Sequence, residues 1–297
     1  MPNKYLKTRK KSQNKKRRSK SKKFKLSSYS SGIPVFFVRH GESTNNVIQE
    51  PLIERKMNNE ITDEEFERIW KSNRMDDPDL TLKGKEQAIA LGKYLKKGLN
   101  ISNRKMHVYS SPFKRTLDTT DGITKSFNKN DYKVTVRPDI FENGGVYSVN
   151  KNSELTKGEC FSGSEIKNKY NYNVDLLPSA GPWYTGNRED DTKSKMRAER
   201  VAKWIKSKEF RKENENKIVL MVMHGNFIDY LLKEIMNINA KLNFKTMSEY
   251  EVHSIYFDTP NTATSLFVVR NGKIIIKNIC NVDHLNLPAE YSIINNI

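Results

Sequence analysis

Two apolar runs that each end in a His-Gly pair constrain this chain more than any other feature. Residues 34–41 (PVFFVRHG) and residues 218–225 (IVLMVMHG) share this pattern. Short β-branched and aromatic runs indicate strands that are buried on both faces of a sheet. A core histidine would account for one such strand end. Because the chain has only five histidines, the second copy favours a functional pair, His40 and His224.

Helical and strand patterns alternate along the rest of the chain, which is typical of an α/β fold with a largely parallel sheet. Asn271-Gly272 lies between the last two apolar runs and predicts a hairpin, which adds an antiparallel edge. The sequence therefore predicts a three-layer αβα sandwich whose ligand crevice lies at the carboxyl ends of the parallel strands. The further elements that we expect are strands at 106–109, 133–137, 264–269 and 273–279, and helices at 81–98 and 196–212 and from His224 onward.

A helix start follows the strand at 106–109 directly. Ser111 is expected to cap this helix and Pro112 to take its first position, which places Arg115 in the first turn. From there its guanidinium can reach back to the end of the strand, where helix N–H groups attract anions. The alternative is a surface arginine, which the helix dipole disfavours unless an anion is bound nearby.

The net charge of +18 is concentrated in a tail. Residues 1–26 contain thirteen Lys or Arg and no acidic residue, which leaves +5 for the rest of the chain. We expect residues 1–32 to be a disordered Lys/Arg-rich arm, because they have too few apolar residues to form a core. Residues 15–23 could serve as a nuclear address, bind nucleic acid or an anionic surface, or be a solvated tail without a partner.

Cys160 and Cys280 lie outside any metal-ligand spacing. They are interpreted as free thiols of a reducing compartment, so a cytoplasmic location is expected, or a nuclear one through the tail. No apolar run approaches the ~18 residues that span a bilayer, and no secretory signal is apparent. We therefore expect no transmembrane segment.

Two long polar segments, 50–79 and 148–192, interrupt the alternation. The first contains a capping box from Thr62 to Glu65, followed by a short apolar helix face. The second is turn-rich and too long for an ordinary connection. We expect both segments to act as lids beside the crevice, although plain surface packing would explain the first equally well.

The expected crevice is cationic, because Arg39, Arg115 and two histidines meet there, and its natural occupant is a phosphoryl group. The chain contains no Walker loop, no dinucleotide-binding glycine motif and no carboxylate cluster that would require Mg²⁺. We therefore expect no metal and no cofactor, and covalent catalysis by a histidine instead.

These motifs together resemble the histidine phosphatase superfamily, which includes the phosphoglycerate mutases. The resemblance covers about residues 33–287 and implies a phosphoglycerate mutase-like domain over 33–297. The matching residues are Arg39-His40-Gly41-Glu42-Ser43, Asn46, Leu80-Thr81, Gly84, Gln87, Ala88, Ser111-Pro112, Arg115-Thr116, Glu142, His224-Gly225, Asn261-Thr262, Asn281 and His284-Leu285.

The resemblance also implies a role for each site residue. His40 would be the phosphorylated nucleophile, and Glu142 would protonate the leaving oxygen and then activate water. Arg39, Arg115 and His224 would neutralise the phosphoryl group, with Asn46 assisting. Only the resemblance, and no local pattern, identifies Glu142 as the proton donor.

Departures from the mutase pattern favour a phosphatase. The cofactor-dependent phosphoglycerate mutases of this family look to carry a Gly-Trp-x-Asp segment before the Leu-Thr motif. This chain has residues 74–79 (RMDDPD) in its place. We therefore expect a metal-independent phosphomonoesterase that acts on a phosphorylated small molecule or a phosphoprotein. The alternatives are a mutase-type phosphotransferase and an inactive scaffold that binds nucleic acid or acidic partners through the tail.

Overall fold

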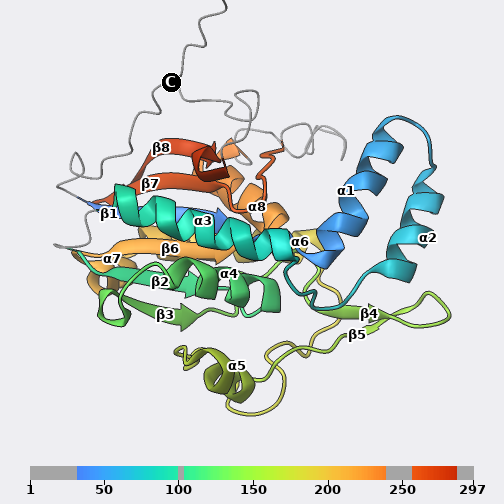
Figure 1. Ribbon diagram of the computed structural model, residues 1–297, viewed down its shortest axis with the longest axis horizontal. Helices are drawn as coiled ribbons and strands as arrows, with labels where there is room; N and C mark the ends of the chain where they lie inside the picture. The colour runs from blue at the N-terminus through green and yellow to red at the C-terminus, as the bar shows by residue number, and fades with distance from the viewer. Residues whose placement is uncertain (1–31, 100–103, 239–255, 286–297) are drawn as a thin grey trace, which may run out of the picture.

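The computed structural model describes residues 32–99, 104–238 and 256–285 (Figure 1). The basic arm expected at 1–32 lies outside the described residues, apart from Gly32. The main element is a six-stranded sheet with the order β3-β2-β6-β1-β7-β8. Its strands are β1 (Ile33–Arg39), β2 (Met106–Ser110), β3 (Tyr132–Val136), β6 (Ile218–Met223), β7 (Thr264–Arg270) and β8 (Lys273–Asn281).

The first four strands in this order are parallel, and the last two form the antiparallel edge. The β7–β8 hairpin turns at Asn271 and Gly272, whose φ angles are both positive, at 50° and 73° respectively. Positive φ at both central residues is the requirement of the tightest hairpin turns. The mostly parallel sheet, the hairpin and the antiparallel edge are thus confirmed.

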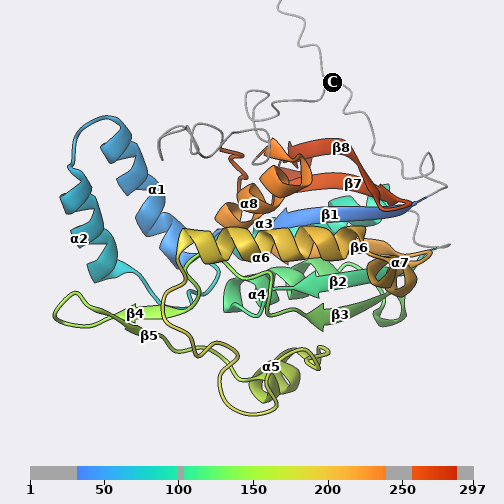
Figure 2. The same ribbon diagram turned by 180° about the vertical axis from the view of Figure 1, so that it is seen from behind.

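Helices cover both faces of the sheet. The helices α3 (Leu82–Gly98) and α4 (Lys114–Thr124) lie on the face seen in Figure 1, whereas α6 (Asp191–Lys206) and α8 (Gly225–Ile235) lie on the face seen in Figure 2. Successive side chains of β1 point to opposite faces of the sheet, so β1 contributes to the hydrophobic core on each face. Phe36 and Val38 pack with α3 and α4, and Val35 and Phe37 pack with α6 and α8. This confirms the three-layer sandwich.

The single helix expected over 196–212 is wrong in its extent. The structure has α6 and then α7 (Lys208–Asn214), separated at Ser207. Ser207 has an extended backbone (φ −73°, ψ 166°), and its hydroxyl accepts a hydrogen bond from the backbone N–H of Phe210 at 3.0 Å. A serine that caps a new helix start offers the chain an alternative to continuing the first helix.

The first polar insertion lies at the end of the sheet where β1 terminates, and the second runs from that end along the β3 edge of the sheet (Figures 1 and 2). The helices α1 (Thr44–Met57) and α2 (Asp63–Asn73) stand out from the body as a pair, and α2 buries none of its residues. The capping box at Thr62 is confirmed. The second insertion contains the small hairpin β4 (Tyr147–Val149) and β5 (Leu155–Lys157), followed by α5 (Gly163–Tyr170). Their role as lids stays a prediction.

Two smaller expectations concern cysteines and membrane spans. Cys160 and Cys280 are both free thiols. Among the helices of the described residues, none combines the length and the apolar character that crossing a bilayer requires.

Candidate active site

His40 and His224 come together because their strands are neighbours. β1 pairs with β6 in parallel, with Arg39 opposite Met223, so each histidine is the next residue at the same edge of the sheet. The two ring centroids lie 5.2 Å apart, with the ring planes at 62°. Both side chains are buried. The structure thus places the two remote His-Gly motifs side by side.

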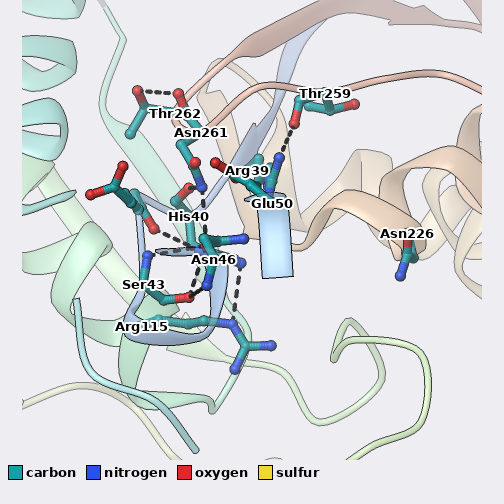
Figure 3. Close-up of polar contacts among 12 residues, drawn as sticks. Arg39, His40, Ser43, Asn46, Glu50, Arg115, Asn226, Thr259, Asn261 and Thr262 are labelled. Atoms are coloured by element: carbon teal, nitrogen blue, oxygen red, sulfur yellow. Dashed lines mark hydrogen bonds and ion pairs between the residues drawn. The ribbon is translucent and has the colours of Figure 1, made fainter. Parts of the chain in front are cut away.

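The hydrogen bonds of His40 agree on one tautomer. Its Nδ1 lies 2.7 Å from the carbonyl oxygen of Gly41 and donates to it, while its Nε2 accepts a bond from Nε of Arg115 at 3.1 Å (Figure 3). The proton therefore sits on Nδ1 and the lone pair on Nε2. Burial, and next the charges of Arg115 and Arg39, lower the pKa of His40 well below its usual value. The ring is consequently neutral at pH 7.

The backbone of His40 is also held in place. Its carbonyl oxygen accepts bonds from the N–H of Thr262 and from Nδ2 of Asn261, both at 3.2 Å (Figure 3). Thr262 has a positive φ of 59° and is itself bonded to His284 through its hydroxyl at 2.8 Å. The motif residues Asn261, Thr262 and His284 thus hold the backbone of His40 in place.

Arg115 lies in the first turn of α4, as expected, but the helix begins later than the sequence indicates. The N-cap is Phe113, which provides no side-chain cap. Ser111 instead continues the pairing of β2, because its N–H donates to the carbonyl oxygen of Val222 at 3.0 Å. The expected capping role of Ser111 is therefore wrong, since β2 pairing keeps this residue extended.

Ser111 contributes to the site itself. Its hydroxyl lies 2.8 Å from Nε2 of His224. The His224 ring also meets the edge of Phe113, with centroids 5.0 Å apart. Nδ1 of His224 is buried and has no partner among the described residues. Burial, followed by the charge of Arg115, lowers the pKa of His224 well below its usual value, so this ring is neutral as well.

Arg39 is threaded past the second His-Gly motif. A Cβ on Gly225 would lie 3.4 Å from Nε of Arg39, which is an ordinary van der Waals contact, so the guanidinium packs directly against this motif. Nη1 donates to the carbonyl oxygen of Thr259 at 2.7 Å, and Nη2 lies 3.8 Å from Oε1 of Glu50 (Figure 3). Nε of Arg39 is buried and lacks a partner within the described parts of the chain. No local pattern in the sequence predicts the contact with Glu50.

Asn46 is oriented by a capping box at the start of α1. Its Oδ1 accepts bonds from the N–H of Ser43 at 3.0 Å and from the Ser43 hydroxyl at 2.8 Å (Figure 3). Asn261 approaches the same oxygen at 3.4 Å. With Oδ1 engaged in this way, the amide nitrogen is the atom of Asn46 that can donate to a ligand.

Glu142 lies in the segment after β3 and is anchored to the start of α8. Its Oε1 accepts bonds from the N–H groups of Asn143 at 2.9 Å and of Phe227 at 3.1 Å. None of the described residues donates to Oε2. Burial raises the pKa of Glu142, and the positive charge of Arg115 opposes that rise. The carboxyl is therefore held in one orientation with one free oxygen.

Arg197 fixes the chain next to Glu142, although no sequence motif marks it. Its Nη1 donates to the carbonyl oxygen of Phe141 at 2.8 Å, and its guanidinium pairs with Glu189 at 2.5 Å. A signal was present, because Arg197 falls on the same helix face as Val201, which is buried. An arginine on the inner face of a helix indicates a buried ion pair.

The donors that surround His40 are nitrogen atoms of arginine, histidine and asparagine. Within the described ranges, no three His, Cys, Asp or Glu side chains cluster closely enough to hold a metal ion. This donor set suits an anion with several oxygen atoms, such as a phosphoryl group.

Several solved structures of phosphatases are similar to this chain. Ecdysone phosphate phosphatase from Bombix mori, solved in complex with tungstate, superposes with a TM-score of 0.52 at 15% identity, over 84% of this chain and 94% of that one. Phosphoserine phosphatase from Entamoeba histolytica gives 0.46 at 20% identity, over 85% and 99% of the two chains. A putative alpha-ribazole-5'-P phosphatase from Escherichia coli gives 0.48 at 14% identity, over 84% and 97%.

No curated protein matches the chain. The family model of the histidine phosphatase superfamily (branch 1) matches residues 35–268. This range includes both His-Gly motifs, Arg115 and Glu142, and it spans most of the chain. The chain therefore belongs to the histidine phosphatase superfamily, branch 1.

Proposed function

We propose that the chain is a metal-independent phosphomonoesterase that transfers a phosphoryl group onto Nε2 of His40. One observation carries the proposal. His40 is a buried, neutral imidazole whose Nε2 lone pair points at the Arg115 guanidinium, while Nδ1 is fixed by Gly41. Such a ring can attack phosphorus without first losing a proton.

The atoms around His40 suit the three oxygens of a phosphoryl group. Nε of Arg39 and Nδ1 of His224 are buried without a partner among the described residues. Arg115 and the amide of Asn46 add further donors beside them. Buried donors without a partner are rare in native proteins, so they indicate a ligand that completes them. Donors of this kind stabilise the charge that develops on the transferring phosphoryl oxygens.

In the first step, the substrate displaces the Arg115 N–H from Nε2 of His40, and this N–H turns to a phosphoryl oxygen. Nε2 then forms a bond to phosphorus as the bond from phosphorus to the ester oxygen breaks. Glu142 in its protonated form gives its proton from Oε2 to the leaving oxygen, which departs as an alcohol. The raised pKa of Glu142 supports this role, because the acid form must be populated near neutral pH.

In the second step, the Glu142 carboxylate takes a proton from a water molecule, and the water oxygen attacks phosphorus. The bond between phosphorus and His40 then breaks, which releases inorganic phosphate and restores the neutral ring. Glu142 is left protonated, as at the start, so the cycle balances.

We further propose that the substrate is a phosphorylated small molecule or a phosphoprotein. The two insertions, 50–79 and 148–192, meet at the end of the sheet that carries His40 and would shape the outer pocket (Figure 1). The sequence of residues 74–79 differs from the mutase pattern, which favours transfer to water over transfer between two positions of one substrate.

The test is a screen of p-nitrophenyl phosphate, phosphorylated metabolites and phosphopeptides on the full chain. We expect phosphate release by the wild-type protein and none above background by His40→Ala, with unchanged thermal unfolding of the variant. A phosphoenzyme that is labile to acid and stable to base should form only in the wild type. Turnover by His40→Ala would refute the nucleophile, and isomerisation without phosphate release would favour a mutase.

A further inference from the structure

Asp77 lies in the segment between α2 and α3 and reaches the start of α4. Its Oδ1 accepts a hydrogen bond from the backbone N–H of Lys114 at 2.9 Å. The side chain is buried, with 5% of the residue exposed. Because Phe113 supplies no side-chain cap, Asp77 satisfies the first N–H of the helix from a distant segment. The residue after Lys114 is Arg115.

The second carboxylate oxygen of Asp77 differs from the first in its surroundings. Oδ2 is buried and unpaired among the described residues. The charges that act on Asp77 are those of Arg115 first, then Lys114 and Asp79. Burial raises the pKa of Asp77 to about 7, against the pull of Arg115. A buried carboxyl that keeps an unpaired oxygen is costly, so a functional reason is expected.

Arg115 depends on this carboxylate in return. Burial lowers the pKa of Arg115 to about 10, and the negative charge of Asp77 is the largest favourable influence on it. Glu142 is second, while Arg39 and Arg74 repel it. The buried guanidinium therefore has two carboxylates to interact with, and one of them is the acid of the proposed mechanism.

We propose that Asp77 is the positioning residue for Arg115. Oδ1 fixes the backbone immediately before Arg115, and the negative charge offsets the buried guanidinium. Together these interactions hold the Arg115 guanidinium beside His40, so that it does not turn to Glu142. The inference rests on the proposed function, because it concerns how that site is assembled.

Loss of the Asp77 charge has a specific consequence for Glu142. The positive charge of Arg115 would then act mainly on Glu142 and favour its ionised form. The pKa of Glu142 would fall, and fewer molecules would hold the proton that an alkyl leaving group requires. Aryl phosphates need no such proton, since aryl oxide ions leave unaided.

Asp77→Asn separates the two parts of this role, because the amide oxygen can still accept the bond from Lys114 while the charge is gone. We expect kcat/KM for an alkyl phosphate, glycerol 3-phosphate, to fall about 10- to 100-fold, and that for p-nitrophenyl phosphate to fall less. The alkaline limb of the alkyl pH profile should move to lower pH. The matched control is Asp79→Asn, an exposed carboxyl two residues away. Its charge is the weakest of the influences on Asp77 named above, so kcat/KM should stay close to that of wild type.

The Arg115→Lys background tests whether Asp77 acts through Arg115. In that background, adding Asp77→Asn should lower kcat/KM little further than Arg115→Lys does alone. Equal losses in both backgrounds, or Asp77→Asn activity equal to that of Asp79→Asn, would overturn the inference. Should the asparagine variant fail to fold, Asp77→Glu keeps the charge but displaces it. We expect that variant to lose kcat/KM while the alkaline limb stays in place, and wild-type kcat/KM would overturn the inference.

The proposed function and this inference fail in different ways. A wild-type chain that is inert toward both esters would overturn the phosphatase function and the inference with it. A wild-type chain that hydrolyses them while Asp77→Asn is indistinguishable from it would overturn the inference alone.

Discussion

Nε of Arg115 donates a hydrogen bond to Nε2 of His40 at 3.1 Å, although the two residues are 75 positions apart in the chain. The contact fixes the plane of the imidazole and directs its lone pair toward the cationic centre. Burial lowers the pKa of His40, and the charge of Arg115 adds to this effect by disfavouring a second proton on the ring. One arginine thus keeps the proposed nucleophile both oriented and unprotonated.

Arg115→Lys retains the positive charge but loses this planar contact. An ammonium group is a point charge and cannot offer Nε to His40 while it also binds phosphoryl oxygens in a fork. We expect kcat/KM for p-nitrophenyl phosphate to fall by about two to three orders of magnitude, the usual cost of one lost transition-state donor. Steady-state kinetics check this, with Arg211→Lys on α7 as the control. A variant within threefold of wild type would contradict the assignment.

Glu142→Gln removes the proton donor and preserves the shape of the side chain. The amide oxygen can still accept the bonds from Asn143 and Phe227, so the turn after β3 should be retained. We expect kcat for alkyl phosphates to fall by about two to four orders of magnitude and that for aryl phosphates to fall much less. Equal slowing of both classes, measured on glycerol 3-phosphate and p-nitrophenyl phosphate, would mean that another group is the acid.

Chelation should leave the proposed activity unchanged. Arginine nitrogens supply the positive charge beside His40, and the proposed steps route no electron pair through a metal ion. We expect the rate with EDTA, after dialysis, to equal the rate before it. Strong inhibition that Mg²⁺ or Zn²⁺ reverses would reject the metal-independent mechanism.

The pairing of His40 with His224 could be predicted from the sequence because it follows from a rule of α/β folds. Parallel neighbours end at the same edge, so similar strand ends come together there. The expected sheet, hairpin and first-turn position of Arg115 follow from equally local patterns. Each is encoded within a few residues of the element it concerns.

Contacts between distant segments could not be predicted in this way. Ser111 was interpreted as a helix cap because serine before proline is a strong local signal, but pairing with β6 keeps it extended beside His224. Asp77 and Glu189 come from the insertions, whose path is set by packing. Glu142 depends on the N–H of Phe227, 85 positions further along the chain, and only the family resemblance indicated it.

His107 lies in the core, away from the proposed chemistry, and reports on acid stability. It is fully buried on β2, with Nδ1 2.7 Å from Oδ1 of Asn214 and Nε2 3.0 Å from the hydroxyl of Thr135. Burial, and then the charge of Lys133, lower its pKa to about 3. Below about pH 6.5 the imidazole of His107 therefore binds a proton in the unfolded chain. In the folded chain it binds this proton only near pH 3.

The free energy of unfolding should consequently fall as the pH drops from about 6.5 toward 3, with a contribution from His107 of about 1.4 kcal/mol per pH unit. Asp77 acts in the opposite sense, because its raised pKa lets the folded chain bind a proton first, so the comparison must isolate His107.

His107→Gln should be less stable at pH 7, by about 1 to 3 kcal/mol, because buried partners lose their bonds. Its stability should also decline less steeply with acid than that of the wild type. Urea unfolding at pH 7, 6 and 5 measures both slopes, and parallel slopes would show that His107 takes up its proton equally in the folded and unfolded chains.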